Sequence, residues 1–96
     1  MSDVIDKAVA ALNEKMGDEG FDSTAKVNIE GEGAIMIDSD GARAGDEEAE
    51  VTMNADAETF QSILEGELDP TAAFMGGRLS IDGDMGVAMK LGGVLS

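Results

Sequence analysis

The order of helical and alternating patterns constrains the fold of this sequence more than any other feature. Apolar residues recur at helical spacing in 3–16, alternating segments follow at 26–30, 34–37 and 48–53, and a weaker strand starts at Ala42. Two helical segments, an alternating segment at 78–82 and a last helical segment at 85–91 complete the chain. This segregated order predicts an α+β fold, with a five-stranded, mostly antiparallel sheet and helices packed on one face. In 48–53, Ala49, Val51 and Met53 face one way and the carboxylates the other, so the second face is expected to be wet and charged.

Helix caps and turns give the expected boundaries of these segments. Asp56 and Asp69 stand where an N-cap is expected, and Pro70 then occupies a first helical position. Asp84 is the expected cap of the last helix, and Ser2 or Asp3 that of the first. Helix ends are expected at glycines, namely Gly17, Gly66 and the pairs at 76–77 and 92–93. Turns are expected at 31–33, 38–41 and 45–47.

The size and charge of the chain limit its partners. With 96 residues it is expected to form a single domain, 1–96, around one core. Its 21 acidic and 6 basic residues give a net charge of −15, and such a surface repels nucleic acid and anionic lipid headgroups. We interpret the acidity as favouring solubility or as adaptation to a salty interior, rather than as a docking site for a basic partner. Neither a secretory signal nor a membrane span is recognisable, so we expect a cytoplasmic protein without a stable membrane anchor.

The sequence offers little for catalysis or metal binding. It has no Cys and no His, which excludes disulfides, thiolate nucleophiles and the commonest metal ligands. Ser23 and Lys26 have the Ser-x-x-Lys spacing of some acyl-serine enzymes, but on a strand they face opposite ways, and we interpret Lys26 as a solvent-exposed residue after a turn. The acidic hairpin fails the EF-hand spacing because Met36 stands at the first ligand position. We therefore predict no catalytic residue, no metal and no cofactor.

The part of the chain from Phe60 onward is rich in large apolar residues. Three of the seven methionines of the chain, Met75, Met85 and Met89, lie in this part and add adaptable thioether side chains to it. By themselves these residues fit either an ordinary core or the lining of a pocket.

Three stretches of the sequence together resemble the sterol carrier protein 2 family. They are 51–56 with Phe60 after it, 66–81, and 84–91, or about half of the chain. They contain a Gly-x-x-x-Pro motif that begins at Gly66, the pair Ala73-Phe74, and a Gly-x-Leu-x-Ile-x-Gly-x-Met motif that ends at Met85. The amino-terminal helix and the meander after it fit the same fold.

The resemblance implies a five-stranded sheet covered by helices that enclose an apolar tunnel, which the last helix helps to close. It implies non-enzymatic binding of a sterol, a fatty acid, a fatty acyl-CoA or another lipid, and leaves open whether the protein transfers this lipid or only stores it. By position in the family pattern, the lining would come from Phe60, Ile63, Leu64, Leu68, Phe74, Met75, Leu79, Ile81, Met85, Ala88, Met89 and Leu91.

Three departures from the family pattern modify these expectations. The chain stops at Ser96 without a longer tail or a peroxisomal targeting tripeptide, which suggests a bacterial stand-alone domain. Its negative charge argues against loading by collision with anionic membranes, so we expect at most a transient membrane contact. The glycines at 92–93 are expected to leave the pocket more open.

Two other functions fit the same residues. The methionine-rich surface is also suited to receive an amphipathic helix of a partner protein, as in an interaction module. A small hydrolase or isomerase with a carboxylate base would require a buried Asp or Glu with a raised pKa in the pocket.

Overall fold

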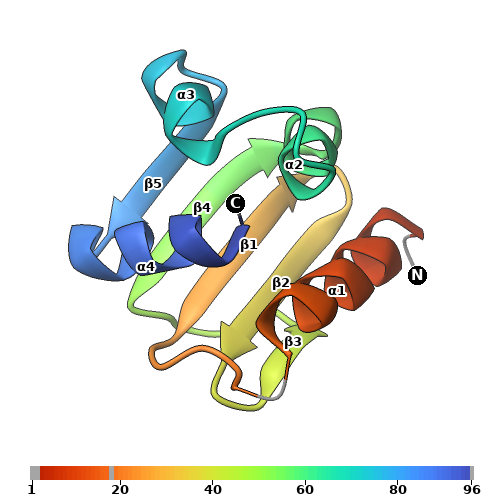
Figure 1. Cartoon of the computed structure of the whole chain (residues 1–96), viewed down its shortest axis with the longest axis vertical. Coiled ribbons are helices and arrows are strands. Elements are labelled where there is room, and N and C mark those ends of the chain that lie inside the picture. Colours follow the sequence, from red (N-terminus) through yellow and green to blue (C-terminus); the bar gives the residue numbers. More distant parts are fainter. Residues whose placement is uncertain (1–2, 18, 96) are drawn as a thin grey trace.

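The computed structural model of the protein describes residues 3–17 and 19–95. Nine elements follow one another in these ranges: α1 (Asp3–Met16), β1 (Ala25–Glu30), β2 (Gly33–Asp38), β3 (Gly41–Ala44), β4 (Val51–Asp56), α2 (Ala57–Leu64), α3 (Pro70–Met75), β5 (Leu79–Gly83) and α4 (Met85–Leu95). The five strands form one sheet in the order β3-β2-β1-β4-β5 (Figure 1). The predicted fold class and number of strands are confirmed, whereas the expected cap Ser2 lies outside the described residues.

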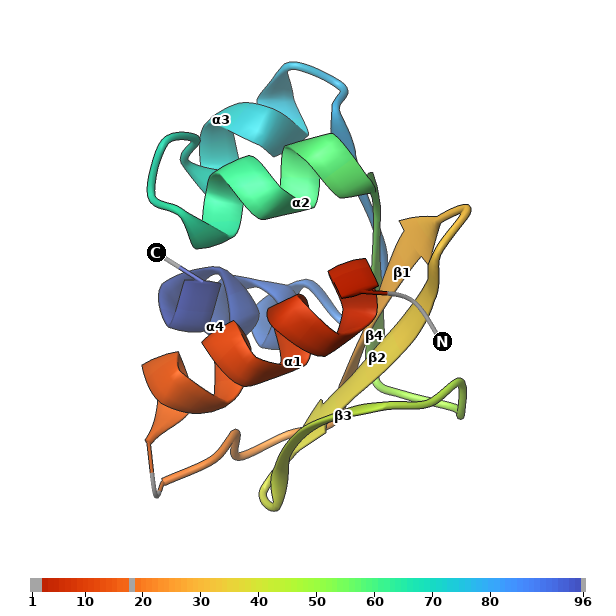
Figure 2. The same ribbon diagram turned by 90° about the vertical axis from the view of Figure 1, so that its right-hand side faces the viewer.

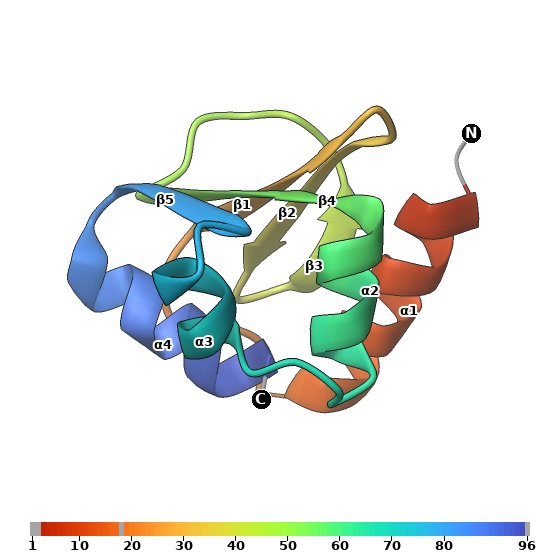
Figure 3. The ribbon, with the colours of Figure 1, turned by 90° about the horizontal axis from the view of Figure 1, so that it is seen from above.

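The sheet is antiparallel except at its centre. β1 pairs antiparallel with β2, β2 with β3, and β4 with β5, whereas β1 and β4 run parallel from the pair Ala25–Val51 to the pair Glu30–Asp56. The parallel pair requires a crossover between β3 and β4, and residues 45–50 provide it. This segment runs over the face of the sheet that faces away from the helices (Figure 3).

All four helices lie on one face of the sheet (Figure 2). Alternate strand residues point toward them, so that Val27, Ile29, Ile35 and Ile37 are almost completely buried. α1 contributes Ile5, Ala8, Leu12 and Met16 to the same core, at the helical spacing that the sequence shows. α1 ends where predicted, because Gly17 has a φ of 62° and donates its backbone N–H to the carbonyl of Asn13.

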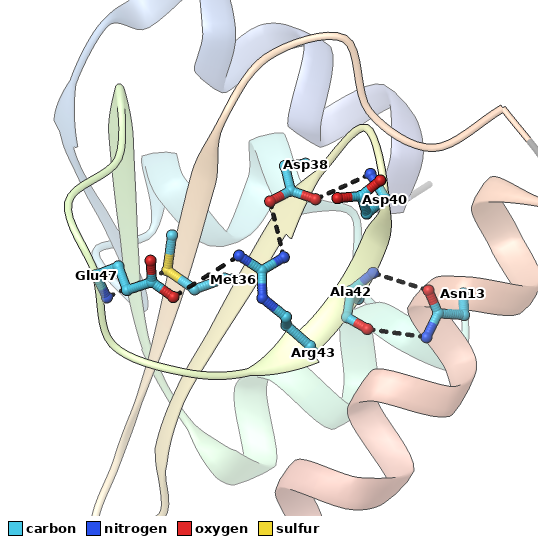
Figure 4. Close-up of polar contacts among 7 residues, drawn as sticks. All are labelled: Asn13, Met36, Asp38, Asp40, Ala42, Arg43 and Glu47. Atoms are coloured by element: carbon cyan, nitrogen blue, oxygen red, sulfur yellow. Dashed lines mark hydrogen bonds and ion pairs between the residues drawn. The ribbon is translucent and has the colours of Figure 1, made fainter.

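Asn13, near the end of α1, also pairs with the backbone of the edge strand β3 (Figure 4). Its Oδ1 accepts from the N–H of Ala42 at 2.8 Å, and its Nδ2 donates to the carbonyl of Ala42 at 3.0 Å. The side chain of Asn13 thus forms hydrogen bonds with the N–H and the carbonyl of Ala42, which have no neighbouring strand to pair with on this edge of the sheet.

The outer face of the sheet is wet only in part. Asn28, Asn54 and Asp82 are polar residues on this face, as predicted, but Met36 is also there and is 1% exposed. The crossover segment covers Met36, and the backbone N–H of Glu47 donates to its sulfur at 3.4 Å (Figure 4). The prediction of a uniformly charged outer face is therefore wrong around Met36.

Two predicted boundaries are also wrong. The strand expected at 48–53 is β4 at 51–56, because the backbone N–H of Glu50 already bonds to Thr24 at the end of the crossover. The glycines at 92–93 do not end the last helix, which continues to Leu95. Leu91 and Leu95 are both 0% exposed, so burial of these two side chains holds the last turn in place.

Candidate functional site

A cleft of about 330 Å³ lies between α3, α4 and the adjacent edge of the sheet, and we call it the α3–α4 cleft. Its volume is at the lower end of the range for small-molecule sites. Figure 1 shows α3 and α4 near the two ends of β5, over the same edge of the sheet. The described residues that line the cleft are Met53, Asp69, Pro70, Thr71, Phe74, Leu79, Ile81, Met85, Ala88, Met89, Gly92 and Gly93.

The sheet supplies the apolar floor of the cleft. Met53 of β4 is directly opposite Ile81 of β5 in the antiparallel register, and Leu79 is two residues before Ile81 on the same face. Met53 and Leu79 are buried, whereas Ile81 is half-buried because it lies toward the open side. The alternation that the sequence shows at 78–82 therefore places these side chains under the helices.

Large apolar side chains form the rim of the cleft. Phe74 on α3 is 41% exposed, and Met85 and Met89 on α4 are 52% and 78% exposed. Met85 and Met89 are four residues apart, so they lie on the same side of the helix. Contiguous exposed apolar surface of this kind is typical of ligand-binding grooves and protein interaction sites, so the cleft is a candidate site for an apolar ligand or partner.

Helix α4 borders the cleft with two glycines. Gly92 and Gly93 are in the helix interior, and a Cβ built on either residue would have no heavy atom within 4 Å. Because these two residues have no side chain, the cleft is more open here than it would be with larger residues. An interior glycine also lowers helix stability by about 0.8–1.0 kcal/mol relative to alanine.

The helices around the cleft begin in two different ways. Asp84 caps α4, because its Oδ1 accepts from the backbone N–H groups of Gly86 at 2.8 Å and Val87 at 3.2 Å. Asp69 precedes Pro70 at the start of α3, but its side chain makes no capping hydrogen bond. Both predicted N-cap positions are therefore confirmed, but the side chain of Asp69, unlike that of Asp84, forms no capping hydrogen bond and is exposed at the cleft.

Comparison with known families identifies the chain. Residues 6–96 match the model of the SCP-2 sterol transfer family. The chain belongs to this family. An SCP-2 domain is a lipid-binding fold, and the predicted resemblance is confirmed.

Relatives of the chain include longer proteins. Hydroxysteroid dehydrogenase-like protein 2 of Danio rerio is 43% identical over 74 residues, which are 69% of this chain and 18% of the fish protein. Sterol carrier protein 2 of Homo sapiens is 32% identical over 84 residues, which are 86% of this chain and 14% of the human protein. The chain thus spans less than a fifth of the length of these relatives.

Solved structures of the family have the same fold. The solution structure of sterol carrier protein 2 from Aedes aegypti in complex with palmitate has a TM-score of 0.78 at 18% identity, and the likeness covers 100% of this chain and 97% of that one. Sterol carrier protein 2 like 2 from Aedes aegypti has a TM-score of 0.72 at 21% identity over 95% of this chain and 92% of that one.

The twelve residues that the family pattern predicted to line one tunnel lie in different parts of the structure. Six of them line the α3–α4 cleft, namely Phe74, Leu79, Ile81, Met85, Ala88 and Met89. Ile63 and Leu91 are buried in the core, Leu68 packs against it, and Met75 is 81% exposed on α3 without lining the cleft.

The remaining two predicted residues, Phe60 and Leu64, line a second cleft, between α1 and α2. This α1–α2 cleft has a volume of about 410 Å³ and is lined by Asp3, Val4, Lys7, Ala8, Ala11, Phe60, Gln61, Leu64 and Glu65. The twelve predicted residues are therefore divided between these two clefts, the core and the surface of α3, and the enclosed tunnel stays a prediction.

Some residues of the α3–α4 cleft were not predicted. The alternation of β4 places Met53 on the core side of the sheet. Its position opposite Ile81 depends on the pairing of β4 with β5, which the sequence pattern does not determine. Thr71 and the glycines at 92–93 carry no apolar side chain that would mark them as lining residues.

The acidic hairpin and its surroundings form a network of ion pairs on the outer face (Figure 4). Arg43 donates to Asp38 at 2.7 Å and lies 3.7 Å from Glu47. The hydrogen bond from Arg43, together with that from the N–H of Asp40, lowers the pKa of the Asp38 carboxyl. Within the described residues, no three His, Cys, Asp or Glu side chains gather as a metal ion would require.

Lys26 lies beside this network. The prediction that it is solvent-exposed is wrong, because its side chain is 21% exposed and its Nζ is 2.8 Å from the carboxylate of Asp46 in the crossover. Residues 3–17 and 19–95 include no helix that combines the length and the apolar character needed to cross a membrane.

Proposed function

We propose that this domain binds one apolar lipid in the α3–α4 cleft, and carries or stores it without chemical change. The observation that carries the proposal is the exposure of Phe74, Met85 and Met89 around an apolar floor. Membership of a sterol transfer family and the palmitate bound to the Aedes aegypti relative support a lipid as the ligand. A lipid would remove these side chains from water, which is favourable in proportion to the apolar area buried.

The energy of burial sets the expected affinity. Complete burial of about fifteen methylenes contributes about 12 kcal/mol at ~0.8 kcal/mol each. Association costs at least about 4 kcal/mol, so a fully enclosed chain would bind with a Kd of about 1 μM. The α3–α4 cleft is open on one side, so a ligand that stays partly in water will bind more weakly than this.

The chemistry of the cleft supports a carrier over an enzyme. The described lining residues include no buried carboxylate that could act as a base, because Asp69, the one carboxylate among them, is exposed. The other lining residues are apolar or glycine, apart from the hydroxyl of Thr71.

The substitution Phe74→Asp tests the proposal. It places a charge on the rim, where the wild-type side chain is 41% exposed, so the fold should persist while binding of an uncharged fluorescent sterol weakens at least about tenfold. Met75→Asp is the matched control, because Met75 is the next residue of α3 and is 81% exposed, but does not line the cleft.

Titration of the sterol followed by fluorescence, together with urea unfolding, checks both variants. Equal affinity of Phe74→Asp and wild type would exclude the α3–α4 cleft as the site. Native mass spectrometry of the purified wild-type protein should in addition show a bound lipid; a stably bound protein in place of lipid would favour an interaction module.

A further inference from the structure

The polar part of a ligand in the α3–α4 cleft would meet negative charge. Among the described residues that line the cleft, Asp69 is the one charged side chain. It is exposed and makes no capping hydrogen bond with α3, so its carboxylate is available to the ligand. Thr71, two residues later, supplies a hydroxyl at the same end of α3.

The basic residues of the chain lie outside the α3–α4 cleft. All six lie within the described residues, and none lines the α3–α4 cleft. Lys26 pairs with Asp46, Arg43 with Asp38, and Arg78 donates to the hydroxyl of Thr59. Lys7 lines the α1–α2 cleft and Lys15 is in the last turn of α1.

Lys90 and Arg78 are each next in sequence to a lining residue, Met89 and Leu79. Arg78 donates to Thr59, and the Nζ of Lys90, on α4, lies 3.4 Å from the carboxylate of Asp22 in the segment before β1. The positive end of α4 is also occupied, because Asp84 accepts hydrogen bonds from Gly86 and Val87 there. An anionic headgroup would therefore find no cationic side chain and no uncapped α4 terminus.

We infer that the α3–α4 cleft selects lipids with an uncharged, hydroxyl-bearing or cationic polar end, and that Asp69 disfavours carboxylates and acyl-CoA thioesters. The inference rests on the proposed function and names the ligand class of that site. A carboxylate accepts hydrogen bonds but donates none, so Asp69 pairs with the O–H of an alcohol or sterol. With an ionised fatty acid it offers only repulsion between like charges, to which the net charge of −15 adds.

Three probes with the same alkyl chain test the inference: dodecanol, dodecylamine and dodecanoate. Each is titrated against the protein carrying an uncharged fluorescent sterol, near neutral pH and at low ionic strength. Dodecanol and dodecylamine should displace the sterol at concentrations at least about tenfold lower than dodecanoate does. High salt should narrow the difference between the amine and the acid, because exposed charges are screened.

Two variants locate the effect. Asp69→Asn should raise the affinity for dodecanoate several-fold and change that for dodecanol much less. Asp82→Asn is the matched control, because it removes the same charge from the outer face of β5, where Asp82 is exposed and does not line the cleft. If both variants improve dodecanoate binding equally, net charge alone is responsible and the role of Asp69 is refuted.

The outcomes separate this inference from the proposed function. If dodecanoate binds as tightly as dodecanol, the inference fails and lipid binding stands. If the fluorescent sterol and all three probes fail to bind, the proposed function fails. A loss of tight dodecanoate binding in Lys90→Gln would show that Lys90 leaves Asp22 to hold the headgroup, which would also overturn the inference.

Discussion

The two pairs of helices on the sheet leave clefts of similar size that differ in polar residues and in exposed apolar side chains. The α1–α2 cleft, about 410 Å³, has five apolar lining residues, and its other four are Asp3, Lys7, Gln61 and Glu65. The α3–α4 cleft, about 330 Å³, is bordered by methionine, phenylalanine and glycine, with one carboxylate. In the described chain, the large apolar side chains that are exposed all belong to α3 or α4.

The two clefts differ more in the exposure of their apolar side chains than in their volumes. α1 is a regular helix of 14 residues, and Leu12 and Ile5 on its inner face are buried. α4 has three glycines in 11 residues and keeps two methionines in contact with water. The first pair of helices thus completes the core, whereas the second leaves apolar surface that a ligand can cover.

The largest expected effect comes from a substitution in the α1 half. Leu12 is 0% exposed, so Leu12→Ala removes buried methylenes and leaves a cavity, which should lower the free energy of unfolding by about 3 kcal/mol. Met89→Ala, at 78% exposure in the α4 half, should change it by less than about 0.5 kcal/mol. Urea unfolding of both variants measures the contrast; equal losses would mean that the two halves are packed alike.

A smaller effect of opposite sign is expected in α4. Gly92 has helical neighbours and open space where the methyl group of an alanine would stand, so Gly92→Ala should raise the free energy of unfolding by up to about 1 kcal/mol. Gly66, after α2, has a φ of 80°, where a side chain is strained, so Gly66→Ala should destabilise the protein instead. Thermal unfolding shows whether each substitution raises or lowers the stability of the protein. Stabilisation by both substitutions would contradict the expectation that only Gly66 needs the backbone conformation of a glycine.

The smallest expected effect concerns pH and compares the starts of α2 and α3. The hydrogen bonds from Thr59, of which the backbone N–H to Asp56 spans 2.7 Å, lower the pKa of the Asp56 carboxyl below its ordinary value. A lowered pKa in the folded state contributes stability above the unfolded pKa of about 3.9, and this contribution is lost as pH falls through the folded pKa.

The stability difference between wild type and Asp56→Asn should therefore shrink on acidification from about pH 5 to about pH 3. Asp69→Asn is the control, because Asp69 makes no capping hydrogen bond with α3. Urea midpoints measured across this pH range give both differences. A difference that stays constant for Asp56→Asn would mean that the cap contributes no pH-linked stability.

Local sequence determined some elements fully. α1 could be predicted from Asp3 to Met16, because the apolar spacing and Gly17 act within one segment. Asp84 was predictable for the same reason, since its capping partners are the backbone N–H groups two and three residues later. By contrast, β4 begins at Val51 because its register with β1 is set by a strand 26 residues away, from Ala25 onward.

Packing decided what local sequence could not. The spacing of Phe60 and Leu64 shows that they share a face of α2, but not that this face borders α1 instead of α4. Gly92 and Gly93 have the composition of a helix end, yet the burial of Leu95 carries the helix past them. The residues of the α3–α4 cleft were predictable where the strand alternation fixed their side, as for Leu79 and Ile81.

The pairing of Asn13 with Ala42 has a consequence for the protein in concentrated solution. An edge strand is a template on which a second chain can add its own strand and begin a fibril. On β3, an incoming chain would first have to break both hydrogen bonds of the Asn13 amide, at 2.8 and 3.0 Å. A domain that exposes methionines on its helical face is thereby hindered, at this edge of its sheet, from assembly into amyloid-like aggregates.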